Sequence, residues 1–190
     1  MIGEIGFPTT IVINGEKTFY KVIKMFASRE RPNAFGIEFG KMSPGGQGVT
    51  LFADQRLLKN VSPALSIVSS FQAVVGIRDW NDGAVFIWYE NDEKEIDGAS
   101  EGLAALLCML GYSSPTRCVT GVVRVMGLAN ENPENYLDVV VDKIDSIDEK
   151  IKGCKEHGWV LGFPAQCQTT EHGGVKLGTV KEAIAFVRGL

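Results

Sequence analysis

An Asn-Gly dipeptide near the amino terminus is the feature that most restricts how this chain can fold. Asn14-Gly15 separates two runs rich in β-branched and aromatic residues, I-V-I at 11–13 and T-F-Y-K-V-I at 18–23. The tightest hairpin turns need positive φ at both central residues, and asparagine and glycine tolerate that conformation best. The pattern therefore predicts that a β-hairpin opens the fold.

The rest of the first half has the pattern of short strands around one helix. Short strands are predicted over 32–40 and 49–53, and a buried strand over 84–89. Apolar residues at helical spacing predict a helix over 61–76 that ends at Gly76.

The second half alternates between helix and strand patterns. The predicted helices cover 101–110 with a stop at Gly111, 144–158 with a stop at Gly158, and 179–188 with Thr179 as cap. The predicted strands cover 118–127, 136–142 and 159–164. This order predicts one α+β domain over 1–190, with several short strands or small sheets packed against about four helices. Residues 1–83 form its strand-rich amino-terminal part and 84–190 its second part.

The charge and hydropathy of the chain exclude several classes of protein. The net charge is -4, 45% of residues are hydrophobic and 22% are charged, as in an ordinary globular domain. No run of Lys and Arg is present, so we expect neither nucleic-acid nor membrane binding. No long apolar stretch or signal-peptide pattern is found, so we expect a cytoplasmic protein, in the host cytoplasm if the gene is viral or phage-encoded.

The cysteines and histidines do not form a recognisable metal or redox motif. Four cysteines, at 108, 118, 154 and 167, include no C-x-x-C pair, which predicts reduced thiols. His157 and His172 are the only histidines, and no H-E-x-x-H is present. The stretch G-I-E-F-G-K-M-S at 36–43 has three residues between its glycines, one fewer than a phosphate-binding loop needs. We therefore expect no metal and no cofactor.

The stretch D-G-A-S-E-G at 97–102 places Ser100 between glycines, directly ahead of an apolar helix. It matches the nucleophile-elbow pattern G-x-S-x-G, in which His157 or His172 would be the base. An elbow needs a buried strand before the serine, whereas the eight residues at 90–97 carry six charges. A Ser-His-Asp hydrolase therefore stays as a secondary hypothesis.

The same stretch closely resembles D-G-P-S-A-G, the signature around the nucleophile of the Lon protease proteolytic domain. Further matches follow in the family's order: V-T-G at 119–121, the helix start S-I-D-E-K at 146–150, Gly158 at the helix end, Pro164 at a strand end, and the tail V-K-L-G-T-V-K-E-A-I at 175–184. The resemblance covers residues 84–190 and is much weaker over 1–83.

This resemblance implies a serine endopeptidase with a Ser-Lys catalytic dyad. It assigns Ser100 as nucleophile and Lys150 as base, with Thr120 and Asp97 orienting or supporting the pair. The resemblance, together with the helix start, assigns oxyanion stabilisation to the backbone N–H groups of Gly98, Ala99 and Glu101. A lysine with the ordinary pKa of about 10.4 is charged at neutral pH, but burial can lower that pKa by several units. Lys150 neighbours Ile147 and Ile151 on a predicted helix face, which is consistent with an inward direction.

Several residues depart from the family pattern. Glu101 replaces a small residue, and an acid beside the oxyanion site could slow catalysis, shift its pH range or select a basic substrate residue. Ala99 replaces proline, and Asp145-Ser146 replace a glycine pair. An insertion, L-A-N-E-N-P-E-N, occupies 128–135.

The expected partner is a polypeptide substrate. No ATPase module is found in the 190 residues, so we expect ATP-independent cleavage of extended or unfolded chains, processing of a polyprotein, or substrate delivery by a separate unfoldase. We expect a monomer or small oligomer, with 39–48 and 128–136 as candidate contact segments. The competing hypothesis is a catalytically silent Lon-like scaffold; such scaffolds lose the serine and the lysine, and both are present here.

Overall fold

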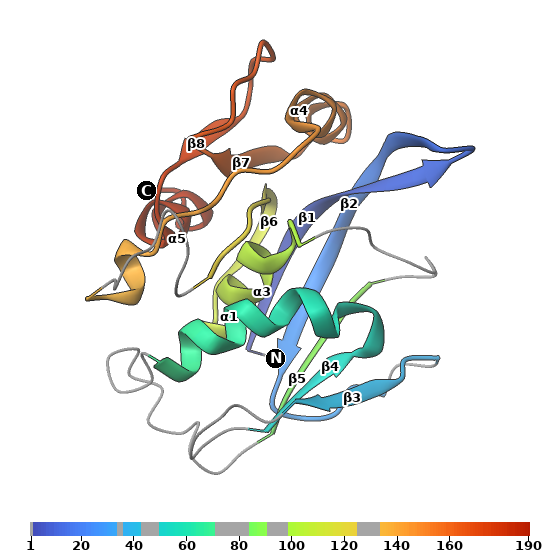
Figure 1. Cartoon of the computed structure of the whole chain (residues 1–190), viewed down its shortest axis with the longest axis vertical. Helices are drawn as coiled ribbons and strands as arrows, with labels where there is room; N and C mark the ends of the chain where they lie inside the picture. The colour runs from blue at the N-terminus through green and yellow to red at the C-terminus, as the bar shows by residue number, and fades with distance from the viewer. Residues whose placement is uncertain (1, 34–35, 43–49, 71–83, 91–98, 125–133) are drawn as a thin grey trace.

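An eight-stranded mixed β-sheet organises the part of the chain that the computed structural model describes, residues 2–33, 36–42, 50–70, 84–90, 99–124 and 134–190 (Figure 1). Its strands are β1 (Gly3–Ile13), β2 (Glu16–Ser28), β3 (Phe39–Met42), β4 (Thr50–Asp54), β5 (Ala84–Tyr89), β6 (Ser113–Val119), β7 (Val160–Pro164) and β8 (Val175–Leu177). They lie in the order β3-β4-β5-β2-β1-β6-β7-β8. Neighbours pair in parallel from β1 through β6 and β7 to β8, and β4 is also parallel to β5.

The predicted hairpin forms the centre of this sheet. β1 and β2 pair antiparallel from Gly3↔Ala27 to Ile13↔Glu16. Asn14 and Gly15 connect them with φ values of 51° and 81°, as the turn requires. The opening prediction is therefore confirmed, although β1 and β2, at 11 and 13 residues, are longer than the short strands that were expected.

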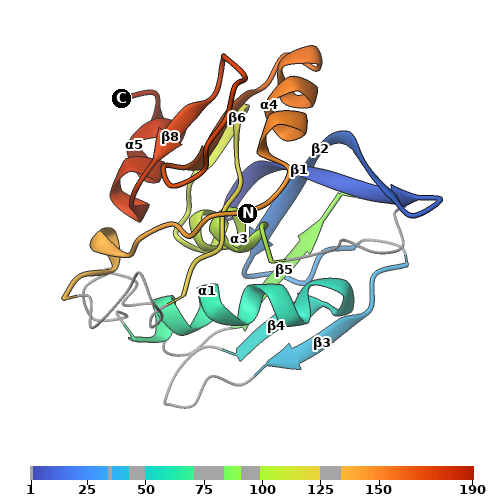
Figure 2. The ribbon, with the colours of Figure 1, turned by 45° about the horizontal axis from the view of Figure 1, so that its top comes forward.

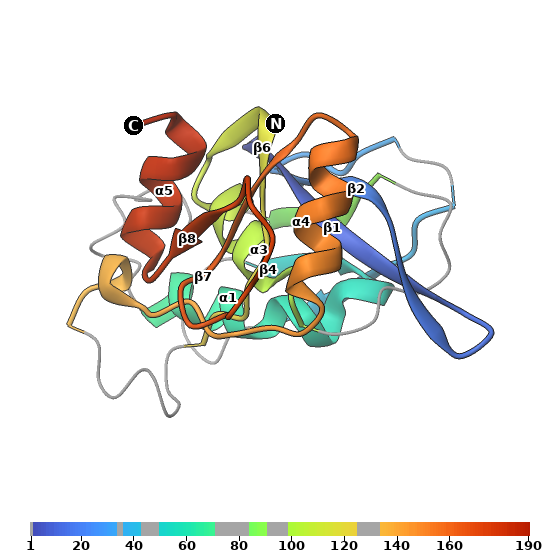
Figure 3. The ribbon, with the colours of Figure 1, turned by 90° about the horizontal axis from the view of Figure 1, so that it is seen from above.

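Helices cover both faces of the sheet. The buried residues of α1 (Leu58–Ser70), α3 (Gly102–Met109) and α5 (Val180–Arg188) belong to the main core on one face. α4 (Ile147–Glu156) packs on the other face, over a smaller core that includes Leu161 and Phe163 of β7. Figure 3 shows α4 and α5 on either side of β6, β7 and β8. Among the described residues, no helix is long and apolar enough to cross a membrane.

The architecture is consistent with the predicted α+β class, but the prediction of several small sheets is wrong, because the described strands form one sheet. One sheet collects strands from both predicted parts of the chain: β5, from the second part, lies between β4 and β2, from the first. Every strand except β3 has at least one buried apolar residue, and a continuous sheet hides more apolar surface than separate ribbons could.

Two predicted strands in the second half are also wrong. β6 ends at Val119, and beyond it 118–127 has only the bridge Val122↔Asp142 among its described residues. Within 136–142, a 3-10 turn (Tyr136–Asp138) is followed by the bridge Val140↔Thr179. Valine-rich sequence favours a strand only where a neighbouring strand is available for pairing. The strand predicted over 32–40 is displaced to β3, and β8 was not predicted.

The predicted helices agree better with the structure because their ends carry local signals. The hydroxyl of Thr179 accepts a hydrogen bond from the N–H of Glu182, as an N-cap should. Gly111 and Gly158 follow α3 and α4 with φ values of 89° and 77°. The predicted end of the α1 segment at Gly76 lies outside the described residues.

Candidate active site

The segment that carries Ser100 lies at the start of a fully buried helix. All eight residues of α3 are buried, and none has a charged side chain. α3 contacts α1 as well as β1, β2 and β6, and lies in the middle of the molecule (Figure 2). The N–H of Gly102 donates to the carbonyl oxygen of Ala99 over 3.2 Å, which closes a turn around Ser100. A helix in the core therefore presents Ser100 at its amino-terminal end.

The chain that follows β6 holds the same turn from the side of the sheet. The N–H of Gly121 donates to the carbonyl oxygen of Ser100 over 2.8 Å, and the N–H of Leu103 donates to the carbonyl of Gly121 over 3.1 Å. The N–H of Thr120 donates to the carbonyl of Gly162 in β7 over 3.0 Å. These bonds tie the turn to the sheet through backbone groups.

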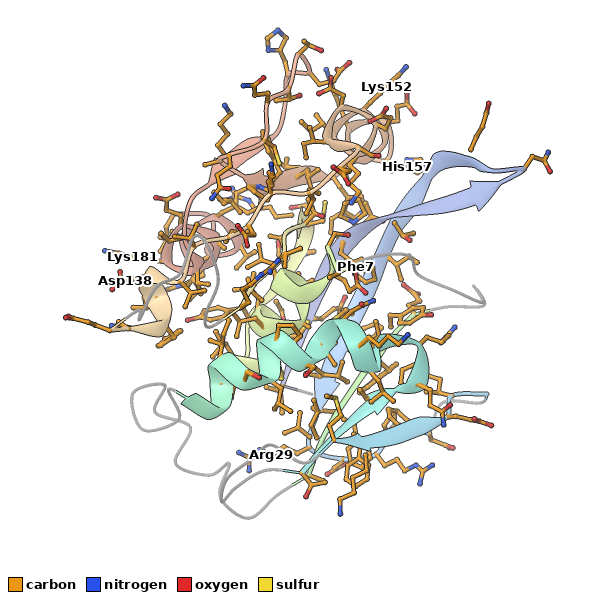
Figure 4. The ribbon with its side chains drawn as sticks, in the orientation of Figure 1. Phe7, Arg29, Asp138, Lys152, His157 and Lys181 are labelled. Atoms are coloured by element: carbon orange, nitrogen blue, oxygen red, sulfur yellow. The ribbon has the colours of Figure 1, made fainter. Side chains whose placement is uncertain are left out.

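Lys150 reaches the site from α4, on the other face of the sheet. The buried residues Ile147, Ile151 and Cys154 recur at helical spacing, and Lys150 shares their face. The lysine is only 5% exposed. Lys152 is exposed, and Figure 4 shows it projecting outward from α4. The inward direction predicted for Lys150 is confirmed, and Lys152 provides a natural comparison.

The side chains of Ser100 and Lys150 meet beyond the carboxyl end of β6. Nζ of Lys150 lies 3.3 Å from Oγ of Ser100, within hydrogen-bond reach. The two residues are 50 positions apart and come from helices on opposite faces of the sheet. The predicted contact between them is therefore present. At this distance a neutral amine can accept the proton of the serine hydroxyl.

Thr120 is fully buried beside this pair. Its hydroxyl donates to the backbone carbonyl oxygen of Ser100 over 3.4 Å, whereas the sequence predicted that it orients the amine of Lys150. A hydroxyl that donates its one proton still has lone pairs that can accept a hydrogen bond from an amine. The contact seen here assigns Thr120 to holding the serine backbone.

The remaining predicted site residues differ in what the structure describes. Asp97 and Gly98 lie outside the described residues. Ala99 and Glu101 flank Ser100, which leaves their backbone N–H groups as predicted oxyanion donors. The side chain of Glu101 is fully buried and accepts a hydrogen bond from Nδ2 of Asn60 in α1. Of the three effects considered for Glu101, selection of a basic substrate residue does not fit this placement, because the carboxylate faces α1 and is shielded from solvent.

The two histidines lie away from the start of α3. His157 follows the last turn of α4, where Nδ1 lies 2.8 Å from the carbonyl oxygen of Gly153 (Figure 4). It lies seven positions after Lys150, or about 10 Å along the helix axis. His172 is exposed in the segment between β7 and β8. Among the described residues, it is the side chain of Lys150, and not that of a histidine, that lies within hydrogen-bond reach of Ser100 Oγ.

The cysteines are unsuited to act as nucleophiles. All four are free and buried. Sγ of Cys118 lies 3.5 Å from Sγ of Cys154, and desolvation raises the pKa of the Cys118 thiol well above its ordinary value. Burial likewise raises the pKa of the Cys108 thiol. The reactive form of cysteine is the thiolate, so the buried thiols of Cys108 and Cys118 are inert. That the cysteines are reduced stays a prediction.

An open pocket of about 410 Å³ lies elsewhere, between β7, β8 and α5. Its lining includes Val160, Val175 and Phe186, together with Arg117, which donates a hydrogen bond to the carbonyl of Phe186. Ser100, Lys150 and Thr120 do not line it. The chemistry of the side chains, and not the size of the pocket, therefore locates the candidate site.

Two contacts at the site were not predicted from the sequence. Asn60 donates to Glu101 from a helix 41 positions earlier, and Gly162 accepts from Thr120. Neither residue belongs to a recognisable motif. The spacing V-T-G could have drawn attention to Gly121, whose N–H and carbonyl both bond to the Ser100 segment.

Comparison with known proteins does not identify a family for this chain. No model of a known protein family matches the chain, and no curated protein matches it.

The first turn of α4, which positions Lys150, is tied to the segment before β8 through Asp148. The hydroxyls of Thr169 and Thr170 donate to the Asp148 carboxylate, and the bond from Thr169 is the main reason that the pKa of this carboxyl is lowered. A lowered folded-state pKa means that the contribution to stability is present above the unfolded pKa, about 3.9 for aspartate, and is lost as pH falls through the folded pKa.

Asp148→Ala is therefore expected to lower the urea midpoint at neutral pH, and the difference from wild type should shrink as pH falls below about 4. Urea unfolding, monitored by circular dichroism over this pH range, measures the difference in midpoint between the variant and wild type. Glu149→Ala is the matched control, because Glu149 is exposed and also lies in the first turn. The same pH dependence in both variants would show that the helix terminus, and not the threonine contacts, accounts for the effect.

Proposed function

We propose that this chain is a serine endopeptidase with a Ser-Lys dyad and a Lon-like proteolytic domain, and that it cleaves extended or unfolded polypeptides. The observation that carries the proposal is the 3.3 Å contact between Nζ of a 95% buried Lys150 and Oγ of Ser100. The order of motifs along 84–190 supports the same assignment. The direct test compares cleavage of labelled casein by the wild-type chain with cleavage by Ser100→Ala and Lys150→Ala variants, and equal rates would overturn the dyad.

Burial of Lys150 is what lets a lysine serve as the base. Desolvation disfavours the ammonium form of a buried lysine and so favours the neutral amine. The neutral amine takes the proton from Ser100 as Oγ forms a bond to the carbonyl carbon of the scissile peptide. The resulting ammonium then returns this proton to the nitrogen of the leaving amine as the C–N bond breaks. An acyl-enzyme on Ser100 remains.

The second half of the reaction uses the same two groups. A water molecule loses a proton to the amine of Lys150 and attacks the ester carbonyl, and the serine oxygen recovers the proton when the ester bond breaks. No proton is gained or lost by the enzyme over the cycle. Backbone N–H groups at residues 98, 99 and 101 stabilise the oxyanion at both stages, helped by the positive end of the α3 dipole.

The rate of cleavage is expected to rise with pH. The amine must be neutral to act, so kcat/KM should increase as pH rises through the pKa of Lys150 in the free enzyme. Initial rates on labelled casein in buffers from about pH 5 to 9, at constant ionic strength, measure this profile. A rate that does not change over that range would contradict lysine as the base.

A further inference from the structure

We propose that Glu101 and Asn60 form a clamp that holds the Ser100 turn against α1 and thereby positions Ser100 beside Lys150. The inference deepens the proposed function and rests on it, because it assigns Glu101 as a positioning residue for the same dyad. Glu101 directly follows the nucleophile, and its side chain accepts a hydrogen bond from Asn60 in α1.

The environment of Glu101 supports this role. The side chain is fully buried, and Oε1 accepts a hydrogen bond from Nδ2 of Asn60, which is half-buried. A carboxylate is expensive to bury unless hydrogen bonds or charges compensate it. The hydrogen bond from Asn60 compensates the buried carboxylate and connects α1 to the start of α3.

The clamp complements the bonds on the opposite side of the turn. Gly121 and Thr120 both donate to the carbonyl oxygen of Ser100, over 2.8 and 3.4 Å, and so fix the turn to the sheet. The side chain of Glu101, the residue after Ser100, is bonded to α1. With anchors on both sides of a single peptide unit, Cα of Ser100 has little freedom to move. The reach of its Oγ to Nζ of Lys150, at 3.3 Å, depends on this placement.

The direction of the carboxylate also matters for the chemistry. Glu101 lies at the N-cap position of α3, where the positive end of the helix dipole stabilises a negative charge. The oxyanion of the proposed reaction develops near the same backbone, and a carboxylate pointing toward it would oppose that charge. The bond to Asn60 keeps the carboxylate directed toward α1. The clamp therefore holds the turn and keeps its own charge away from the reacting atoms.

The test measures kcat and KM on labelled casein for five variants of the full chain, four single substitutions and the double variant that combines Glu101→Ala with Asn60→Ala. Glu101→Ala and Asn60→Ala each break the clamp, whereas Glu101→Gln keeps an oxygen acceptor for Asn60. Val61→Ala is the matched control, because Val61 is fully buried in the same helix and its loss weakens packing without removing the clamp. All assays are run at a temperature where circular dichroism shows each variant folded.

The expected result is a reduced kcat with little change in KM. Misplacement of a reacting group by about 1 Å can reduce rates by about a hundred-fold, so we expect losses of about ten- to a hundred-fold for the two alanine variants. The double alanine variant should lose no more than either single variant, because both remove the same bond. Glu101→Gln should stay within about three-fold of wild type, since it retains a weaker neutral bond. Rates for both alanine variants equal to that of Val61→Ala would overturn the clamp.

A second measurement tests the clamp without relying on peptidase activity. Ser100→Cys places a thiol beside Lys150, whose amine can take the proton of the thiol. The ammonium that results stabilises the thiolate and so speeds alkylation by iodoacetamide. Mass spectrometry follows the alkylation rate. Ser100→Cys alone defines the fast limit, and Ser100→Cys combined with Lys150→Met defines the slow limit. Adding Asn60→Ala or Glu101→Ala should move the rate toward the slow limit, and adding Val61→Ala should not.

These two measurements separate the inference from the proposed function. If the wild-type chain does not cleave casein in a Ser100-dependent way, the proposed function fails, and the alkylation rates still decide whether the clamp positions residue 100. If the wild type cleaves casein but both Asn60→Ala and Glu101→Ala behave as Val61→Ala does in both measurements, only the clamp fails.

Discussion

Ser100→Ala and Lys150→Met are each expected to reduce the rate of casein cleavage by about a thousand-fold or more, because nucleophile and base act as one unit. Methionine resembles lysine in shape and is apolar, so it fills the site of a 95% buried side chain without burying a charge. The melting temperature of Lys150→Met should therefore be equal to or above that of wild type. Loss of activity without loss of stability would assign the effect to chemistry.

Two further lysine variants sharpen this experiment. Lys152→Met removes the same charge from the exposed face of α4 and should leave the rate unchanged. Lys150→Arg keeps a positive charge, but a guanidinium remains protonated and cannot accept the serine proton, so this variant should be inactive. An active Lys150→Arg enzyme would mean that the position supplies charge and not a base. Wild-type rates in Ser100→Ala would rule out Ser100 as the nucleophile.

Gly121→Ala is expected to have the second largest effect, on both stability and activity. A Cβ on Gly121 would clash with Cγ1 of Val141 and would lie 3.4 Å from Cγ of Pro164. Val141 is fully buried and β-branched, so it cannot rotate away without disturbing the core. Overpacking of this kind destabilises a protein by about 1–3 kcal/mol. Because the N–H of Gly121 holds the carbonyl of Ser100, the displacement should also reduce cleavage by about ten- to a hundred-fold.

Gly102→Ala is the matched control for this prediction. Its Cβ would lie 3.5 to 3.7 Å from Val123 and Asn60, which is ordinary van der Waals contact, and alanine favours the helix. Urea unfolding and casein cleavage should therefore change little in this variant. Should Gly121→Ala prove as stable and as active as Gly102→Ala, the role assigned to the 120–121 segment would be wrong.

Sequence reasoning succeeded where the signal is local. The turn at Asn14-Gly15, the cap at Thr179 and the helix ends at Gly111 and Gly158 depend on the conformations of a few adjacent residues. The inward direction of Lys150 followed from its position beside Ile147 and Ile151 on one helix face. In each case the controlling interaction lies within about one helical turn or one β-turn, so a short stretch of sequence contains it.

The strands of the second half show where such reasoning fails. β6 begins in S-S-P-T-R, a polar stretch without apolar alternation, and is a strand because β1 and β7 lie on either side of it. The more strand-like residues 136–142 have no such neighbours and form a 3-10 turn and isolated bridges. Backbone pairing between distant segments outweighs β-propensity, which spans only about 1 kcal/mol.

The candidate site divides in the same way. The resemblance in motif order predicted that Ser100 pairs with Lys150 and that Thr120 lies nearby. The sequence alone could not show that the Thr120 hydroxyl holds the backbone of Ser100, or that the Glu101 side chain turns into the core to meet Asn60. The direction of a side chain depends on which distant element packs against it, and only the tertiary structure brings α1 to the start of α3.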